Sequence, residues 1–345
     1  MIEPIKKRKY DILSFGEVML RLSPAGSERI AYSESFEKRA GGSELNVVSG
    51  ACMLGLSGGL ITKLPENEIG KYARRRIRFS GVDDSLVSLD SRPEARLGIY
   101  YCESGAYPRQ SVVSYDRRGS SFTALRVEEI PEEVFSSAAV FHTCGITPSL
   151  GESIKKETLK IIEGFKRGGA LISFDVNYRA TLWSEEEARA CIFDILPLVD
   201  VLFVSEETLR RMFGMSGSLR EIHRSLARQF PTLKLIASTR RGAKSPRRQD
   251  FTSLAYDCGE DVHYEESPYE DIEVVDRIGS GDAYVAGALF ALCRFCSAEQ
   301  MVKYGNAMAA LKNTTLGDMP ECDLSDVQRI IRNHSAQGDG SEMVR

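Results

Sequence analysis

The segment Asp276-Arg-Ile-Gly-Ser-Gly-Asp282-Ala-Tyr-Val-Ala-Gly287 combines a glycine-rich turn with the start of a helix of small residues. The apolar stretch 272–275 before it predicts the end of a strand. Between strand and helix, the backbone N–H groups of Gly279, Ser280 and Gly281 would point outward at the positive end of the helix dipole. This arrangement predicts an anion-binding turn.

Asp282 stands inside this turn, where its carboxylate would repel a bound phosphate. It fits the turn if it takes a proton from a hydroxyl that attacks a phosphoryl group held by the amides. The other interpretation is a helix N-terminus at which the aspartate is a favourable partner of the dipole and the glycines allow tight packing. The segment by itself leaves both interpretations open.

Strand-like and helix-like segments alternate along most of the chain outside this turn. Short apolar runs predict strands at 10–15, 58–62, 139–143, 170–175, 200–204 and 233–238. Helical patterns lie at 43–56, 67–80, 151–168, 184–196 and 218–229, and from Gly281 to about Asn333. Strands separated by helices indicate βαβ units, and the predicted fold class is therefore α/β with a mostly parallel sheet covered on both faces.

The stretch 96–121 breaks this rhythm because it has no helical pattern. Residues 97–102 and 111–115 predict two strands around a turn-rich connection. With residues near 21–31 they are expected to form a small separate sheet that projects from the main one.

Charge and composition exclude several classes of protein. The 345 residues carry 45 Lys and Arg against 49 Asp and Glu, a formal net charge of −4. Broad nucleic-acid binding needs a basic surface, so no nucleic-acid partner is expected, although a local anion pocket remains compatible. No apolar run approaches the roughly 20 residues that cross a bilayer, and the basic start of the chain lacks the apolar core of a signal peptide. We expect a cytoplasmic protein without a membrane partner, whose eight scattered cysteines are reduced.

Two further stretches have ligand-binding chemistry. In Ala40-Gly-Gly-Ser-Glu-Leu-Asn46, Gly42 would let a ligand approach the backbone and Asn46 can hydrogen-bond to hydroxyls. Phe174-Asp-Val-Asn-Tyr-Arg-Ala-Thr-Leu-Trp183 follows the carboxyl end of a predicted strand, the edge where open α/β sheets bind ligands. A plain loop-to-helix junction and a polar surface loop are the alternatives at these two places.

Together these stretches resemble the ribokinase-like (PfkB-type) carbohydrate kinases. The segment 276–287 is similar to the C-terminal signature of that family, and Gly42 with Asn46 to part of the N-terminal one. Within the family the chain resembles 2-keto-3-deoxygluconate kinases, in the segments 98–101, 114–121, 141–148, 175–183, 275–282 and 310–318. The resemblance covers residues 10–318, nearly the whole chain.

The resemblance implies a three-layer α/β/α sandwich with a small β-sheet lid. One domain would span 1–334, with the lid formed from about 18–40 and 96–121, and a flexible C-terminal tail would follow at 335–345. ATP and Mg²⁺ are the implied cofactors. Exposed lid edges are templates for pairing between subunits, so a homo-oligomer, a dimer through the lid sheet, is expected.

The resemblance also implies roles for individual residues. Asp282 would be the catalytic base, with Gly279, Ser280 and Gly281 forming the anion hole for the transferring phosphate. The implied sugar contacts are Gly42, Asn46, Tyr100, Tyr115, Arg117, Arg179 and Asp318. The implied nucleotide contacts are Thr239, Arg240, Gly279, Gly281 and Asn306.

Arginines in the expected cleft point to an acidic substrate, because the planar fork of arginine is well suited to a carboxylate. Arg117 and Arg179 are two such residues. The leading hypothesis is therefore an ATP-dependent sugar-acid kinase that converts 2-keto-3-deoxygluconate to its 6-phosphate. The alternatives are a kinase of a neutral sugar, such as fructose or ribose, and a non-catalytic homologue that binds sugar or nucleotide. A dinucleotide oxidoreductase is disfavoured, since no G-x-G-x-x-G follows the first strand.

The chain departs from the family pattern at three places. Ser205-Glu-Glu-Thr208 replaces the usual Asn-x-x-Glu-like segment, which leaves Glu206 and Glu207 as the nearby carboxylates for an indirect Mg²⁺ role. The stretch 238–248 is expected to be an irregular basic loop close to the nucleotide, and both phosphate binding and a solvated, mobile loop are open as its role. Ser43 stands where a small apolar residue is commoner, which is expected to be a mild change.

Overall fold

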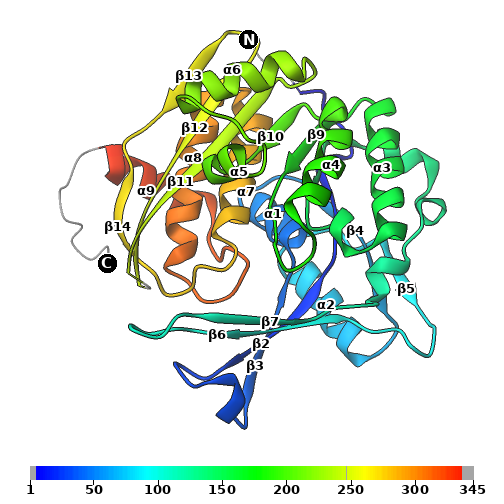
Figure 1. The fold of residues 1–345 in the computed structure, drawn as a ribbon. Helices are drawn as coiled ribbons and strands as arrows, with labels where there is room; N and C mark the ends of the chain where they lie inside the picture. Colours follow the sequence, from blue (N-terminus) through cyan, green and yellow to red (C-terminus); the bar gives the residue numbers. More distant parts are fainter. Residues whose placement is uncertain (1–4, 246, 336–345) are drawn as a thin grey trace.

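The computed structural model describes residues 5–245 and 247–335 (Figure 1). The flexible tail expected at 335–345 lies outside the described residues, apart from Ser335, which ends helix α9 (Leu324–Ser335).

A ten-stranded sheet forms the centre of the molecule, in the order β13-β12-β11-β10-β9-β8-β1-β4-β5, with β14 paired to β12. All neighbours from β11 to β5 are parallel, and the pairs made by β12 with β11, β13 and β14 are antiparallel. The strands are β1 (Tyr10–Phe15), β4 (Gly58–Pro65), β5 (Val87–Asp90), β8 (Ala138–Cys144), β9 (Leu171–Asp175), β10 (Val201–Phe203), β11 (Leu235–Ser245), β12 (Arg248–Asp257), β13 (Val262–Glu265) and β14 (Tyr269–Glu273). The mostly parallel sheet predicted from the sequence is confirmed.

Helices cover both faces of this sheet and form two separate apolar cores with it. One core holds α1 (Ser43–Met53), α2 (Glu68–Phe79), α7 (Ser280–Phe295), α8 (Ala298–Asn313) and α9. The other holds α3 (Glu152–Arg167), α4 (Glu185–Ile195), α5 (Glu206–Arg211) and α6 (Leu219–Gln229). Within the described ranges, none of these helices has the length and apolar character needed to span a membrane.

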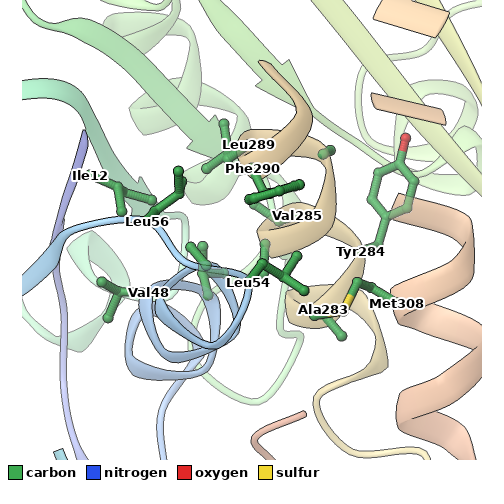
Figure 2. Close-up of a cluster of buried hydrophobic side chains, with 14 of the residues drawn as sticks. Ile12, Val48, Leu54, Leu56, Ala283, Tyr284, Val285, Leu289, Phe290 and Met308 are labelled. Carbon is green, nitrogen blue, oxygen red and sulfur yellow. The ribbon is translucent and has the colours of Figure 1, made fainter. Parts of the chain in front are cut away.

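Helix α7 is the central element of the first core because its small residues allow close packing on both sides (Figure 2). Its Val285 and Leu289 belong to the same buried apolar cluster as Leu54, which follows α1 (Figure 2). Gly287 faces α8, where a Cβ atom would come within 2.4 Å of the carbonyl oxygen of Tyr304. The run of small residues after Asp282 therefore fixes the depth of α7 in the core, and with it the position of its N-terminal turn.

The lid expected from the sequence is present as a separate four-stranded sheet, at the bottom of Figure 1. Its order is β3-β2-β6-β7, built from β2 (Met19–Pro24), β3 (Phe36–Gly41), β6 (Gly98–Glu103) and β7 (Val112–Asp116). Arg21 of β2 forms ion pairs with Asp276 at 2.7 Å and with Asp318 at 2.8 Å, and all three residues are buried. This charge cluster ties the lid to the loops beside α7.

Two predictions about the C-terminal half are wrong. The basic stretch 238–248 is not an irregular loop, because β11 continues to Ser245 and pairs antiparallel with β12. The chain is also not continuously helical after Gly281, since α8 ends at Asn313 and α9 begins only at Leu324. The intervening turn carries Asp318 into the space between the lid and α7.

Candidate active site

A cleft of about 1030 Å³ lies between the lid, the carboxyl ends of β9 to β11 and the N-terminus of α7. Parallel strands end at the same edge of a sheet, which is the usual position of a ligand site in such folds. The cleft is lined by nearly every residue singled out in the sequence: Gly42, Asn46, Tyr100, Tyr115, Arg117, Arg179, Glu206, Glu207, Thr239, Arg240, Gly279, Ser280, Gly281, Asp282 and Asp318. The structure thus brings these residues together around one cavity.

Asn306 is the exception. Its side chain is fully buried, accepts a hydrogen bond from Ser253 at 2.7 Å and donates one to Glu266 at 2.9 Å. It is not among the residues that line the cleft. Its expected contact with the nucleotide stays a prediction.

The turn before α7 leaves its amides accessible. Gly279 has φ of +82°, and a Cβ atom there would come within 1.9 Å of the carbonyl oxygen of Asp318, so only glycine fits. No side chain among the described residues caps the N-terminus of α7. The N–H of Ser280 donates to the carbonyl oxygen of Arg277 at 3.3 Å, whereas that of Gly281 is left to bind an anion in the cleft.

Two side chains hold the carboxylate of Asp282 from the neighbouring helix α1. Ser43 donates to its Oδ1 and Asn46 to its Oδ2, both at 2.7 Å. Asn177 in turn donates to the Ser43 hydroxyl at 3.0 Å. Gly42, just before these residues, has φ of +143° and a Cβ atom would lie 2.3 Å from the carbonyl oxygen of Glu17, which explains the glycine at the start of α1.

Asn46 keeps an unused acceptor in the cleft. Its side chain is buried, and its Oδ1 atom has no hydrogen-bond partner in the part of the chain that the structure describes. A buried amide oxygen without a donor is costly, by about 1–3 kcal/mol. A ligand hydroxyl would satisfy it, which agrees with the sugar-binding role expected for Asn46.

Asp175 is a second carboxyl group near Asp282. It ends β9, and its Oδ1 accepts from the backbone N–H of Asn177 at 3.2 Å. Burial raises the pKa of Asp175 to about 7, and the negative charge of Asp282 adds to the effect. The site therefore holds two acidic groups in one charge environment, of which Asp175 exchanges its proton near neutral pH.

The two arginines expected to recognise a carboxylate differ in their surroundings. Arg117 is buried and already paired with Glu17, to which its Nε donates at 2.8 Å. Arg179 is exposed to the cleft, donates to the carbonyl oxygen of Tyr178 at 3.0 Å, and forms no ion pair with any described carboxylate. Arg179 is thus the free member of the expected pair.

The lid contacts Asp318 through Tyr100. The Tyr100 hydroxyl donates a hydrogen bond to Asp318, and the ring of Tyr115 lies 5.7 Å from that of Tyr100. Burial raises the pKa of Asp318, against the opposing effect of its ion pair with Arg21. The substrate contacts expected for Tyr100 and Asp318 would therefore be made by an already connected network.

The carboxylates suggested for Mg²⁺ are occupied by arginines. The Oε1 atom of Glu206 lies 2.6 Å from Nη2 of Arg210, and its Oε2 atom lies 2.7 Å from Nε of Arg240. Its partial burial acts to raise its pKa, but the hydrogen bonds from these two arginines outweigh it and lower the pKa. Glu207 lies 3.5 Å from Arg211. Among residues 5–245 and 247–335 no group of three His, Cys, Asp or Glu side chains is arranged to hold a metal ion.

Sequence reasoning missed three residues that the cleft contains. Ser43 is a direct partner of Asp282 rather than a mild substitution. Arg241 and Arg277 also line the cavity. The place of Arg277 in the glycine-rich turn is a sequence signal that could have identified it as a cleft residue. Arg241 gives no such signal, because the sequence predicts a loop where β11 continues.

The arrangement can hold an anion at the α7 turn and accept a proton on a carboxylate beside it. Arg179, Arg241 and Arg277 add positive charge to the same cavity. These are the parts needed to move a phosphoryl group onto a hydroxyl, since that reaction depends on positioning, charge neutralisation and a base.

Comparisons with known proteins agree with this chemistry. Residues 9–323 match the model of the pfkB family carbohydrate kinases. The chain is 34% identical over 326 residues to 2-dehydro-3-deoxygalactonokinase of Haloferax volcanii, covering 94% of this chain and 98% of the relative. It is 30% identical over 320 residues to Fructokinase-1 of Zea mays, covering 90% and 93%. The crystal structure of 2-dehydro-3-deoxygluconokinase from Thermotoga maritima superimposes with a TM-score of 0.88 at 29% identity, covering 93% and 98%.

Proposed function

The chain belongs to the pfkB family of carbohydrate kinases, and from this premise we propose that it transfers the γ-phosphoryl group of ATP to the terminal hydroxyl of a sugar acid. The substrate class is a 2-keto-3-deoxyaldonate, with 2-keto-3-deoxygluconate and its 6-phosphate as the leading pair. The observation that carries this proposal is Arg179, a cleft arginine without an ion-pair partner among the described carboxylates.

The relatives support the same substrate class. The names of the Haloferax and Thermotoga proteins state a 2-dehydro-3-deoxygalactonate and a 2-dehydro-3-deoxygluconate specificity. The two sugar acids share the carboxylate, the keto group and the deoxygenated carbon, and they differ in the configuration of one hydroxyl. A free arginine recognises the shared carboxylate and does not distinguish the epimers, so both belong in the first assay.

In the proposed mechanism Asp282 accepts the proton of the attacking hydroxyl. Ser43 and Asn46 orient its carboxylate, and the free Oδ1 of Asn46 receives a second hydroxyl of the sugar. The turn before α7 binds the transferring group through the amide of Gly281, where charge must be stabilised. The lid covers the cleft and excludes water, which would otherwise accept the phosphoryl group.

Mg²⁺ would enter with the nucleotide. When bound, it neutralises charge on the phosphates. Both oxygens of Glu206 are held by arginines, so the residues present fit an ion carried mainly by the phosphates rather than one enclosed by protein carboxylates. Thr239 and Arg240, at the end of the cleft formed by β11, are the proposed nucleotide contacts.

A neutral sugar is the second candidate. The ion pair between Arg117 and Glu17 favours it, because it removes one of the two arginines expected to face a carboxylate. A non-catalytic homologue is less compatible with the site, since a protein that only binds has no use for a base placed between two hydrogen-bond donors.

A coupled ADP-release assay with ATP and Mg²⁺ tests the proposal. The panel contains 2-keto-3-deoxygluconate, its galacto epimer, gluconate, fructose, ribose and no sugar. We expect at least tenfold higher kcat/KM for a keto-deoxy acid than for fructose or ribose, which corresponds to about 1.4 kcal/mol. A preference for a neutral sugar would contradict the proposed acidic substrate but not the kinase activity. Binding of ATP without turnover of any sugar would indicate a protein that binds its ligands without catalysis.

The cytoplasmic location and the oligomer remain part of the proposal. The lid sheet ends in strands β3 and β7, and Val112 and Tyr115 of β7 expose large apolar side chains. An edge of this kind can pair with a second copy. Light scattering is expected to give a dimer, and a monomer at micromolar concentration would contradict it; fractionation of the source cells tests the location.

A further inference from the structure

We propose that Arg241 is a catalytic residue that binds the phosphoryl group during transfer and neutralises the charge that develops on it. The inference rests on the proposed function, because it assumes phosphoryl transfer at the N-terminal turn of α7.

Strand β11 carries Arg241 beyond the edge of the parallel sheet. The pairing of β11 with β10 ends at Ala237, opposite Phe203. From there β11 continues to Ser245, and in the part of the chain that the structure describes β12 is its one strand partner there. The three residues Thr239, Arg240 and Arg241 therefore extend past the carboxyl end of β10 and line the cleft.

Neighbouring residues of a strand point to opposite faces, and this separates Arg240 from Arg241. Arg241 is paired across the ladder with Phe251, and its guanidinium lies 5.8 Å from the centre of that ring. The buried Phe251 contacts Tyr284 of α7, with ring centres 5.8 Å apart. Arg241 thus lies on the face of the sheet that carries α7.

Arg240 has the opposite environment. Its Nε donates to Glu206 at 2.7 Å, and its Nη1 lies 3.3 Å from Glu265. Two carboxylates therefore already neutralise Arg240. Of the two adjacent arginines, Arg241 is the one whose charge no described carboxylate neutralises through an ion pair, while Arg240 keeps these two partners beside its proposed nucleotide contact.

The guanidinium of Arg241 reaches the anion-binding turn. Its Nη2 atom lies 3.0 Å from the position that a Cβ atom would occupy on Gly281. The surrounding protein atoms, which displace part of its water, and the positive charges of Arg179 and Arg277 lower the pKa of Arg241, whose side chain is still exposed to the cleft; the negative charges of Asp175 and Asp282 oppose this effect. This mutual influence places the arginine within the charge environment of the proposed base.

Positive charge is unbalanced at this end of the cleft. Other arginines lining the cavity have carboxylate partners: Arg117 with Glu17, Arg210 and Arg240 with Glu206, and Arg211 with Glu185. Arg179, Arg241 and Arg277 form no ion pair with any carboxylate in the described ranges. Even with the carboxylates of Asp175 and Asp282 in the same cleft, three arginines without an ion pair are more than one substrate carboxylate engages, and the phosphates of the nucleotide supply further negative charge.

Sugar hydroxyl, phosphoryl group, Asp282 and Arg241 each have a defined part in the proposed transfer. The sugar hydroxyl oxygen forms a bond to the γ-phosphorus, and the bond from that phosphorus to the oxygen bridging the β-phosphate breaks. The hydroxyl proton passes to Asp282, and ADP leaves with the electron pair of the broken bond. Arg241 donates two N–H groups to oxygens of the transferring phosphoryl group, a geometry for which the planar guanidinium is suited.

Substitution of two arginines on the same hairpin tests this role. Arg241→Gln removes the charge and keeps a polar side chain of similar length, while Arg241→Lys keeps a point charge without the fork. Arg248→Gln is the matched control, because Arg248 lies on β12 and pairs with Asp271 and Glu273 outside the cleft. Steady-state rates are measured with the sugar that the wild-type protein phosphorylates fastest, so the outcome does not depend on the acid being correct.

Arg241→Gln is expected to lower kcat by 100-fold or more, with KM for the sugar changed less than threefold. Arg241→Lys is expected to recover part of the loss, and Arg248→Gln to stay within twofold of wild type. A loss of less than threefold in kcat for Arg241→Gln overturns the inference. A raised KM for the sugar at unchanged kcat overturns it too, because the arginine then binds the substrate carboxylate.

Binding of a transition-state mimic gives a second readout. With sugar present, ADP and aluminium fluoride together should bind wild type at least tenfold more tightly than ADP alone. Arg241→Gln is expected to lose this difference while its affinity for ADP changes little. Equal enhancement in wild type and Arg241→Gln would overturn the inference even if turnover were low. If the wild type phosphorylates no sugar, the proposed function fails. The comparison of aluminium fluoride binding between wild type and Arg241→Gln then still tests whether Arg241 binds a phosphoryl group.

Discussion

Ser43 donates a hydrogen bond of 2.7 Å to the carboxylate of Asp282, which lies 239 residues further along the chain. The contact joins the first turn of α1 to the first turn of α7, the two helices whose N-termini meet in the cleft. With Asn46 bound to the second oxygen, it fixes both oxygens of the proposed base. Rotation of this carboxylate is therefore restricted before a substrate binds, which agrees with a group that must accept a proton in one direction.

Asp282→Asn should abolish most turnover. The amide keeps the shape of the side chain and its contact with Ser43, but it cannot take the hydroxyl proton. Loss of a general base typically costs 10²–10⁴-fold in rate. We expect kcat to fall by about this amount, with the affinities for ADP and sugar within threefold of wild type in calorimetry. A variant with more than a tenth of the wild-type kcat would show that Asp282 is not the base.

Ser43→Ala should give a smaller defect of the same kind. It removes one of the two donors to Asp282 and leaves the carboxylate itself in place. We expect kcat to decrease about 3–10-fold, on the order of the 1 kcal/mol that one hydrogen bond contributes. The double variant Ser43→Ala/Asp282→Asn should be no slower than Asp282→Asn alone. Additive losses in that cycle would contradict a role of Ser43 through Asp282.

Asp175→Asn should stabilise the protein in a pH-dependent way. The pKa of Asp175 is raised from 3.8 to about 7 by burial and by Asp282, so between these values the folded state holds a proton that the unfolded state has lost. Stability contributed at this position therefore falls as pH rises from about 4 to 7 and stays low above. The asparagine removes this loss and can keep the contact with the Asn177 amide.

Melting temperatures of wild type and Asp175→Asn provide the measurement. The difference between them should be small at pH 4, grow through pH 5 and 6, and reach roughly 2 °C or more at pH 8. A pH-independent difference for Asp175→Asn would contradict the raised pKa.

The fold and most of the site were predictable because their signals are local. The glycines at 279 and 281 and the small residues after Asp282 are contiguous, and the apolar runs of β8 to β10 are buried on both faces. The hydrophobic pattern that marks a strand in the sequence stops at the residue where that strand is no longer buried. The distal half of β11 therefore carries no strand signal, and its sequence predicts a loop at Arg240 and Arg241.

Pairings between distant residues could not be predicted from the sequence. Glu17 and Arg117 are 100 residues apart, and nothing in either neighbourhood identifies the other as its partner. The charge of Arg117 was therefore counted as free for a substrate. For the same reason the sequence does not identify Glu206 as the partner of Arg240, which lies 34 residues away.

Arg179→Gln should separate acidic from neutral substrates. A charge-assisted hydrogen bond to a carboxylate contributes about 1.5–3 kcal/mol, so kcat/KM for a keto-deoxy acid is expected to fall roughly 10–150-fold. Fructose or ribose, if turned over at all, should be affected less than threefold. Equal losses on acid and neutral sugars would mean that Arg179 acts on the nucleotide or on the fold instead.

Lys312→Met should weaken both the fold and the reaction, although Lys312 does not line the cleft. Its side chain is fully buried on α8, and its Nζ donates to the carbonyl oxygens of Asp276 at 3.1 Å and Thr315 at 3.2 Å. Burial lowers the pKa of Lys312, while the charges of Asp276 and Asp318 oppose this. The ammonium thus joins the loop before α7 to the turn that carries Asp318.

Methionine has a similar length and no donor, so both carbonyls lose their donor and the carboxylates of Asp276 and Asp318 lose a nearby positive charge. Removing one member of a buried charge cluster costs about 3–5 kcal/mol, and urea unfolding should show a loss of this order. Lys303→Met is the matched control: Lys303 lies on the same helix and pairs with Glu299 at the surface, where such a pair contributes about 0.3–0.5 kcal/mol. Below the urea transition, Lys312→Met should also show a lower kcat than Lys303→Met, because the α7 turn is no longer held. Equal stability of the two variants would contradict the structural role of the buried ammonium, and equal kcat would separate it from the anion-binding turn.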